Sequence, residues 1–394
     1  MSPSSPARRA RWRRGAGAAL LALLGAGSVQ AELPVETLTT ERLPADATHR
    51  LYVADPAMTH ILDGRLHVVD GNNMRYLGML GTGFSGASSL TPDGRYITVV
   101  TTYHSRNQRG PRTDVVEVYT ANDLTFQFEV EIPAKHLQGL PTKALTTYTP
   151  DGRYLLIQNA TPATSITVVD LQEKRFVAET PNPGCYGLVP WQDGSRRFSS
   201  FCGDGTLSTI RLDAQGQPSA PEVSAPFFDP DKDPVYTHFE QIGDRAVLVS
   251  YAGSVYGVKL SGDKPSFETP WSFVSPAEQK QGWKPGGYQL FAVDRDTQRL
   301  IVGMHPKAIE GSHKNPAEQL WVLDLTKRQR VARVPGHAAV AMIASQGPQA
   351  RLFLLSGADN TLLSFDLRKA NGLSKPLKVS APVGETPIYL GMTP

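Results

Sequence analysis

Residues 93–100 read DGRYITVV, and almost the same stretch returns as DGRYLLIQ at 151–158. Each copy places a turn and then an arginine before a run of apolar residues that is typical of a buried strand. Five more segments share this order: HRLYVAD at 49–55, SRRFSSFC at 195–202, DRAVLVSY at 244–251, QRLIVGMH at 298–305 and ARLFLLSG at 350–357. Seven copies of one unit indicate a repeat architecture.

A second strand-like segment follows each copy and often ends near an aspartate, as in RLHVVD at 65–70 and SITVVD at 165–170. In most repeats a polar turn and a third strand come next, for example LTFQFEVEI at 124–132. The first segments begin about 45 to 60 residues apart, which is the length of a propeller blade. The best candidate for a helical turn is PAEQKQG at 276–282. The sequence therefore predicts an all-β fold, a seven-bladed β-propeller.

The beginning of the chain has the order of a secretory signal peptide. Five arginines at 8–14 precede an apolar run at 16–26, and the segment ends in VQA at 29–31. The alternative, a membrane anchor, needs about 20 apolar residues, and this run has about 11. We therefore predict a signal peptide over 1–31, one propeller domain over 32–394, and a periplasmic protein without a membrane span.

The signal peptide also explains the apparent basic character of the chain. The whole sequence has 40 basic and 37 acidic residues. Five of the basic residues and none of the acidic ones lie in the first 31 positions, which leaves 35 against 37. A nearly neutral mature chain gives no indication of a nucleic-acid-binding surface.

The two cysteines, Cys185 and Cys202, both lie in the exported part of the chain. A pair of cysteines in an oxidising compartment most simply forms one disulfide. A redox role would favour a C-x-x-C pair, which the sequence lacks.

The segment GTGFSG at 81–86 fits the glycine pattern of a dinucleotide-binding turn. That fingerprint requires a helix directly after the glycines and an acidic residue about 20 positions later. Only four residues separate Gly86 from the next turn, and residues 101–113 contain no carboxylate. These glycines therefore belong to a loop that displays Phe84.

The residues alone predict no catalytic, cofactor or metal site in this chain, because the nine histidines are scattered and the common catalytic motifs are missing. Three segments interrupt the repeat at 101–118, 282–289 and 304–322. Each mixes aromatic and basic residues, a composition that suits an interface. The alternative is that they are ordinary long loops of the blades.

Several of these segments resemble the heavy subunit of the quinoprotein amine dehydrogenases, whose light subunit carries tryptophan tryptophylquinone. The matching stretches are LGMLGTGFSG at 77–86, residues 106–118, GWKPGGYQ at 282–289, Cys185-Tyr186 and FCGDG at 201–205. Within this family, TTYH at 101–104, QNATPATSI at 158–166 and the 304–314 segment are most similar to the aromatic amine dehydrogenase heavy chain.

The resemblance implies a periplasmic heterotetramer of two heavy and two light chains. Such a complex deaminates primary amines, here expected to be aromatic, to aldehyde and ammonia, and it passes electrons to an azurin-like or amicyanin-like copper protein. The cofactor and the catalytic groups would belong to the light subunit, so the heavy chain would not itself be catalytic.

For individual residues, the resemblance implies that Phe84 lies at the mouth of the substrate channel, and it supports a disulfide between Cys185 and Cys202. The alternative for Phe84 is packing between blades. For the whole chain, the alternatives are a methylamine dehydrogenase heavy subunit, a periplasmic scaffold without enzymatic function, and, less well supported, an independent propeller enzyme with a quinone or metal at its axis.

Overall fold

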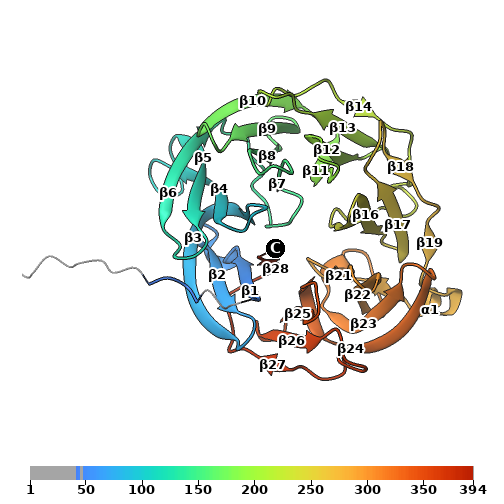
Figure 1. The fold of residues 1–394 in the computed structure, drawn as a ribbon. Coiled ribbons are helices and arrows are strands. Elements are labelled where there is room, and N and C mark those ends of the chain that lie inside the picture. The colour runs from blue at the N-terminus through green and yellow to red at the C-terminus, as the bar shows by residue number, and fades with distance from the viewer. Residues whose placement is uncertain (1–40, 45–47, 394) are drawn as a thin grey trace, which may run out of the picture. The chain divides into compact units, whose positions relative to one another are not determined.

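The computed structural model describes residues 41–44 and 48–393, which form a ring of antiparallel β-sheets (Figure 1). The predicted signal peptide, 1–31, lies outside the described residues. Two 16-residue strands, β3 (Arg75–Leu90) and β24 (Gln329–Ala344), each pass from the outer edge of one blade to the inner edge of the next. With these two strands divided, the sheets make seven blades, which confirms the predicted propeller.

Each blade begins with an inner strand at the axis and ends with an outer strand at the rim. Blade 1 contains β28 (Tyr389–Met392), β1 (Arg50–Asp55), β2 (Gly64–Asp70) and the first half of β3. Blade 2 contains the second half of β3, β4 (Tyr96–His104), β5 (Arg112–Thr120) and β6 (Phe126–Ile132). Blade 3 contains β7 (Thr146–Tyr148), β8 (Tyr154–Asn159), β9 (Ser165–Asp170) and β10 (Arg175–Pro181). Blade 4 contains β11 (Cys185–Pro190), β12 (Arg197–Cys202), β13 (Leu207–Arg211) and β14 (Glu222–Val223).

The remaining blades follow the same order. Blade 5 contains β15 (Glu240–Ile242), β16 (Arg245–Val249), β17 (Ser254–Lys259), β18 (Ser266–Phe267) and β19 (Trp271–Ser272). Blade 6 contains β20 (Lys284–Pro285), β21 (Phe291–Asp294), β22 (Arg299–His305), β23 (Ala317–Asp324) and the first half of β24. Blade 7 contains the second half of β24, β25 (Arg351–Ser356), β26 (Leu362–Asp366) and β27 (Lys378–Val379). The helical segments are η1 (Met58–His60), α1 (Pro276–Lys280) and η2 (Ser312–Lys314).

The recurring turn and arginine have a direct structural role. In the turn before β8, the Thr149 hydroxyl donates a 2.5 Å hydrogen bond to Asp151, and Gly152 has φ of 70°. Arg153 then donates two hydrogen bonds, of 2.8 and 3.1 Å, to Asp170 at the end of β9. In blade 3 the arginine and the aspartate of the repeat are thus partners across neighbouring strands, a pairing that favours one register, whereas Arg95 of the DGRYITVV copy pairs with Asp93 of its own turn.

The hydrophobic core lies between adjacent blades, because each sheet buries both faces against its neighbours. Strands β1, β8, β9 and β12 are buried along their whole length. The two largest fully buried side chains, Trp191 and Trp321, lie in separate clusters of this core. The predicted helical turn is confirmed as α1, where Ser275 caps the helix and Glu278 completes the capping box.

The last strand closes the ring. β28 pairs with β1 in antiparallel register, with Leu51 opposite Met392 and Ala54 opposite Tyr389. Gln289 of the connection into blade 6 adds two hydrogen bonds to the backbone of Leu390, with lengths of 2.8 and 3.1 Å. Among the described residues, no helix is long and apolar enough to cross a membrane.

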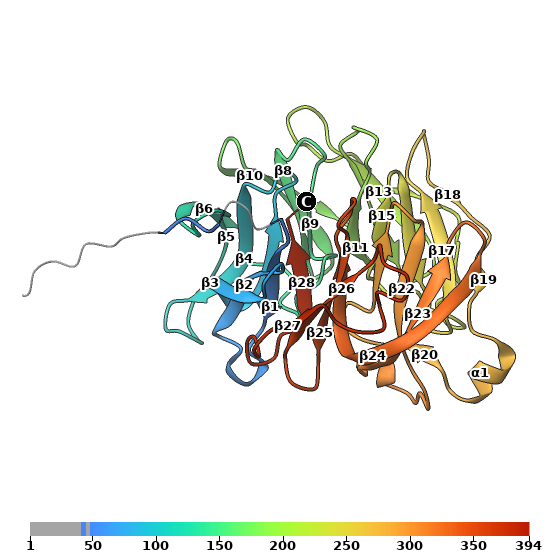
Figure 2. The ribbon, with the colours of Figure 1, turned by 60° about the horizontal axis from the view of Figure 1, so that its bottom comes forward.

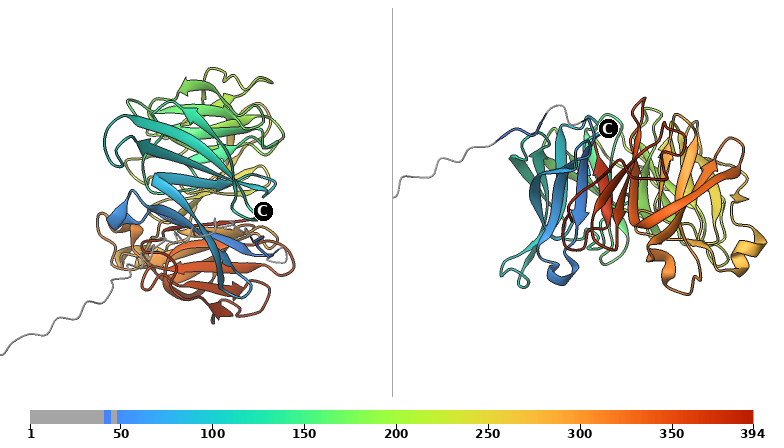
Figure 3. Two further views of the ribbon diagram at one scale, coloured as in Figure 1. Left: turned by 90° about the vertical axis from the view of Figure 1, so that its left-hand side faces the viewer. Right: turned by 90° about the horizontal axis from the view of Figure 1, so that it is seen from below.

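The ring has two distinct ends. We call one the loop face: it carries the loops between the second and third strands of each blade and the connections from each blade to the next. The opposite end, the turn face, carries the short turns between first and second strands and between third and fourth strands. Figure 2 shows α1, which belongs to a blade connection, at the loop face, and the side views in Figure 3 show the loops gathered at the two ends of the ring.

Candidate functional site

The segments that interrupt the repeat all reach the loop face. Residues 105–111 join β4 to β5, residues 306–316 join β22 to β23, and 282–289 belongs to the connection into blade 6. Phe84 and the Cys185–Cys202 pair are at the same end of their blades. Residues that are far apart in the sequence therefore share one face of the propeller.

Phe84 stands on a tightly wound turn where the chain crosses from blade 1 to blade 2. Gly83 has φ of 61° and Ser85 has φ of 49°, both in the left-handed region that favours glycine. A Cβ atom on Gly86 would lie 2.0 Å from the carbonyl oxygen of Thr82, so only glycine fits there. The register of β3 against β4 shifts between Phe84 and Ala87, as in a β-bulge, which is a device that re-aims a side chain.

The same turn accounts for the glycine pattern GTGFSG. After Gly86 the chain continues as a strand to Leu90, whereas a dinucleotide fingerprint needs a helix at this point. Gly83 and Gly86 are required by the bulge, which also approaches Gly64 closely: a Cβ on Gly64 would lie 2.7 Å from the Gly83 oxygen. The sequence predicted a loop here; the structure instead has residues 81–86 inside strand β3, with the bulge at Phe84.

The Phe84 ring is half-buried and meets the ring of His104 edge to face, with centroids 6.2 Å apart. Phe84 is paired with Thr102 on β4, two residues before that strand ends at His104. The loop that follows is closed by hydrogen bonds from Ser105 N to Pro111 O and from Arg106 N to Arg109 O, of 3.1 and 3.0 Å. The Phe84 side chain thus packs against His104 at the end of β4 and stays partly exposed.

A buried carboxylate fixes the base of this loop. Asp114, with no exposed surface, accepts hydrogen bonds of 2.7 Å from Thr102, 2.6 and 2.7 Å from Arg112, and 2.7 Å from His136 Nδ1. Burial alone would raise the pKa of Asp114, but the hydrogen bonds from His136 and Arg112 outweigh it and hold the pKa well below its ordinary value. The network ties β4, β5 and the connection into blade 3 together beneath residues 105–111. Sequence reasoning missed it, because its members are 34 positions apart at the extremes (Thr102 to His136).

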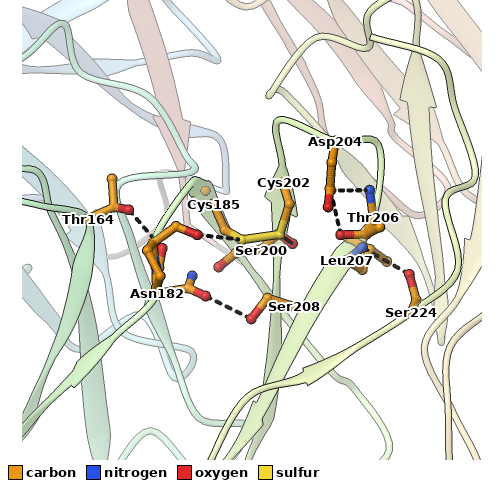
Figure 4. Close-up of a disulfide and its surroundings, with 12 residues drawn as sticks. Thr164, Asn182, Cys185, Ser200, Cys202, Asp204, Thr206, Leu207, Ser208 and Ser224 are labelled. Atoms are coloured by element: carbon orange, nitrogen blue, oxygen red, sulfur yellow. Dashed lines mark hydrogen bonds between the residues drawn. A yellow bond between two sulfur atoms is a disulfide. The ribbon is translucent and has the colours of Figure 1, made fainter.

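The disulfide predicted between Cys185 and Cys202 is confirmed. Cys185 opens β11 and Cys202 ends β12, and the two residues are directly opposite each other in the sheet, with an S–S distance of 2.06 Å. Figure 4 shows the bond beside Asn182, whose backbone oxygen accepts a hydrogen bond from Thr164 and whose side chain accepts one from Ser208. The disulfide therefore locks the inner edge of blade 4 at the loop face.

The two interrupting segments of blade 6 pack on each other. Lys307 N and Ala308 N donate to the oxygens of Gln281 and Gly282, at 3.1 and 2.9 Å, and Gly287 N donates to His313 O at 3.1 Å. The His313 ring stacks on Tyr251 of blade 5, with centroids 5.7 Å apart. These contacts make the two segments one ordered layer over blades 5 and 6.

The tryptophans of these segments are internal. Trp283 and Trp321 are buried in one core cluster with ring centroids 5.5 Å apart, so they are not available as interface anchors. The apolar side chains that the loop face does expose are Met58, Ile61, Tyr103 and Ile309. A mixture of aromatic and basic residues suits an interface, but composition does not distinguish a core tryptophan from a surface one.

Within residues 41–44 and 48–393, no group of three or more His, Cys, Asp or Glu side chains is arranged to hold a metal ion. Two buried carboxylates at the loop face, Asp55 and Asp114, are instead held by internal hydrogen bonds. Asp55, like Asp114, is buried and accepts backbone hydrogen bonds, from Ala57, Glu385 and Thr386, at 2.8, 2.6 and 3.0 Å.

Comparisons with known proteins agree with this picture. The family model for the methylamine dehydrogenase heavy chain matches residues 46–387. The methylamine dehydrogenase heavy chain of Methylobacillus flagellatus is 29% identical over 345 residues, which cover 86% of this chain and 84% of that protein. The corresponding chain of Methylorubrum extorquens is 26% identical over 370 residues and covers 89% of each.

Solved structures show the same fold at low sequence identity. A functionally unknown protein from Desulfotomaculum acetoxidans has a TM-score of 0.59 at 12% identity, covering 88% of this chain and 98% of that one. The dihydro-heme d1 dehydrogenase NirN has a TM-score of 0.53 at 14% identity, covering 90% of this chain and 77% of that one. At these identities the likeness concerns the fold alone.

Proposed function

Because the chain belongs to the methylamine dehydrogenase heavy chain family, we propose that it is the heavy subunit of a periplasmic amine dehydrogenase whose light subunit carries tryptophan tryptophylquinone. The observation that carries the proposal is the family match, which extends over almost all of the described propeller. The quinone supplies the amine oxidation chemistry from the light subunit. The heavy chain docks that subunit and shapes its substrate path.

The loop face is our candidate for the docking surface, and Phe84 for the residue at the substrate channel. The bulge holds the Phe84 ring in a fixed position at this face, half-buried and supported by His104. An apolar ring beside a neighbouring active site excludes water, and excluding water strengthens electrostatic interactions inside that site. A rigid gate of this kind can select amines by size without taking part in the chemistry.

We propose primary amines as the substrate class and methylamine as the first one to test, because the family and the named relatives are methylamine dehydrogenase heavy chains. The sequence favoured aromatic amines, and the comparisons give that finer expectation no support. Aromatic amines remain the second candidate on the strength of the TTYH segment at 101–104, which adjoins Phe84 through its pairing with Thr102. A blue copper protein is the proposed electron acceptor.

The deciding experiment is to purify the untagged protein from the cells that make it and to record its subunit composition and visible spectrum. The proposal requires an equal amount of a small second chain and a quinone absorbance that methylamine or 2-phenylethylamine bleaches. The amine that bleaches it at the lower concentration identifies the substrate class. A colourless single chain, unchanged after mixing with periplasmic extract, would instead favour a scaffold without enzymatic function.

A further inference from the structure

The axis of the propeller holds a cavity of about 790 Å³. Residues of β3, β7, β11, β15, β21, β24 and β28 line it, and in Figure 1 the strands β7, β11, β21 and β28 lie near the centre of the ring. Arg295 and Gln346, in the turns after β21 and β24, line its entrance at the turn face. The volume is that of a typical small-molecule site, and its entrance is opposite the loop face, so nothing about it depends on the proposed function.

The deep part of this cavity contains one balanced ion pair. Lys143 Nζ lies 3.3 Å from Glu240 Oε2, and Glu240 Oε1 lies 3.6 Å from His238 Nε2. His238 Nε2 is also 3.0 Å from the carbonyl oxygen of Phe291, to which it donates, and burial lowers the pKa of His238 to about 4, so this histidine is neutral at pH 7. The ammonium and the carboxylate therefore cancel, so a charged ligand in this deep part has no compensating partner; Arg295, the other charged side chain of the lining, lies at the entrance.

The same region has hydrogen-bonding capacity to spare. Lys143 uses one of its three donors on Glu240. Burial and the charge of Glu240 raise the pKa of Tyr389, which keeps its hydroxyl protonated, and within the described residues this hydroxyl makes no hydrogen bond. Ser88 adds a further hydroxyl to the wall. Donors and acceptors of this mixture match the hydroxyl groups of a ligand, each of which donates and accepts.

Apolar surface alternates with these groups. The Phe239 ring lies under the Lys143 ammonium at 4.8 Å, and Leu90, Ile343 and the Tyr389 ring also line the cavity. Such surfaces suit the C–H faces of a ring that carries hydroxyls at its edge. We propose that the axial cavity binds a neutral, polyhydroxylated small molecule of the size of a monosaccharide or disaccharide.

The test uses three probes that share one hydroxylated skeleton and differ in charge: glucose, gluconate and glucosamine. Their binding to the full chain is measured by isothermal titration calorimetry, with sucrose as a larger neutral probe. We expect glucose or sucrose to bind saturably, with a Kd of about 1 mM or below, and both charged probes to bind at least tenfold more weakly.

Two variants locate the binding. Gly391→Leu fills the cavity from β28, where an added Cβ meets only ordinary contacts, the nearest at 3.6 Å, and it should abolish binding. Tyr389→Phe removes one hydroxyl and should weaken binding several-fold, whereas Tyr76→Phe, which removes a hydroxyl on the outer strand of blade 1 that pairs with His67 outside the cavity, should not. Circular dichroism checks that each variant is folded. If Gly391→Leu does not fold, the affinity of Tyr389→Phe decides whether the ligand binds in this cavity.

Three results would overturn the proposal. One is the absence of saturable binding by either neutral probe to the unmodified chain. Another is equal affinity for the neutral and charged probes. The third is an affinity that folded Gly391→Leu and Tyr389→Phe leave unchanged, because the ligand would then lie elsewhere.

Discussion

Phe84 shows how a few backbone atoms can set the place of one side chain. Its neighbours Gly83 and Ser85 occupy the left-handed region, and Gly86 leaves no room for a Cβ atom. An unusual backbone of this kind persists only where the surrounding structure determines it. The left-handed backbone at Gly83 and Ser85 lowers the stability of this turn, and it fixes the position of the Phe84 side chain.

Gly86→Ala tests this requirement. The new methyl group would lie 2.0 Å from the Thr82 oxygen, so the turn must move, and we expect a loss of about 1–3 kcal/mol in the free energy of unfolding. Gly81→Ala in the same hexapeptide is the matched control, because its Cβ meets no atom within 4 Å and its φ is not positive. Urea unfolding of both variants measures the difference, and equal stabilities would contradict the account of the turn.

Phe84→Ala tests the proposed role of Phe84 at the substrate channel separately from the fold. Removing a half-buried ring from the loop face should change kcat/KM for long and short amines by different factors, about tenfold or more for one of them, while the light subunit still binds. Steady-state kinetics with methylamine and 2-phenylethylamine measure this. Phe126→Ala removes an exposed ring from the outer strand β6 and serves as the control. Identical ratios for Phe84→Ala and the unmodified complex would remove Phe84 from the channel.

At the level of elements, the strands of a blade differ in how well the sequence predicts them. The second strands of all seven blades were recognisable, because they are buried along most or all of their length and start after a turn with an arginine. The inner strands were not recognisable. β7 and β15 have three residues each, and they carry polar side chains because one of their sides faces the axial cavity. Short strands with polar residues lack the pattern that sequence reasoning needs.

Some features of the candidate site could be predicted from the sequence, and others could not. The cysteine pair could be predicted because the chain has only two cysteines. The glycines around Phe84 marked an unusual backbone, but they predicted a loop where the structure has a bulge within β3. The Asp114 network could not be predicted, because its residues come together only when β4, β5 and the next blade connection pack. The burial of Trp283 and Trp321 likewise depends on how blades 5 and 6 meet.

The contact between blades 5 and 6 also predicts a pH dependence. The pKa of His238 is about 4 in the folded protein because of burial, and about 6.5 when the chain is unfolded. The unfolded state therefore binds more protons below pH 6.5, so this contribution is complete above pH 6.5 and is lost as the pH falls toward 4. The loss amounts to about 3 kcal/mol.

His238→Gln should flatten the fall in stability between pH 6.5 and pH 4, since glutamine offers a donor to Phe291 O but does not titrate. His60→Gln replaces an exposed histidine and should leave the profile as it is. Urea unfolding across this pH range gives the two profiles. If the slope of His238→Gln equals that of the unmodified chain, the pH dependence arises from other groups.

For the whole molecule, stability depends on ring closure. Seven blades bury their faces only against one another, so the ring needs both neighbours of every blade. The first blade obtains its inner strand from the other end of the described chain, through the pairing of β28 with β1. The backbone hydrogen bonds of Leu390 to Gln289 connect this closure to blade 6.

Leu390→Ala weakens the closure, because Leu390 is fully buried in the cluster shared by blades 1 and 7. We expect a loss of about 2–5 kcal/mol in the free energy of unfolding. Leu377→Ala, at a leucine that is 44% exposed, should change it by less than about 0.5 kcal/mol. Thermal and urea unfolding compare them, and similar values for the two would show that closure contributes little.

The pairing of β28 with β1 also sets the order in which the protein can mature. β1 is made first and β28 last, so blade 1 waits with an open edge until nearly the whole chain has been synthesised. An open strand edge invites pairing with other chains. A chain that is truncated or clipped before β28 keeps that edge. The loss of a C-terminal strand is then exposed at β1, near the beginning of the described chain. The unpaired edge of β1 therefore distinguishes an unfinished chain from a finished one, and it is a site where proteases and chaperones can bind.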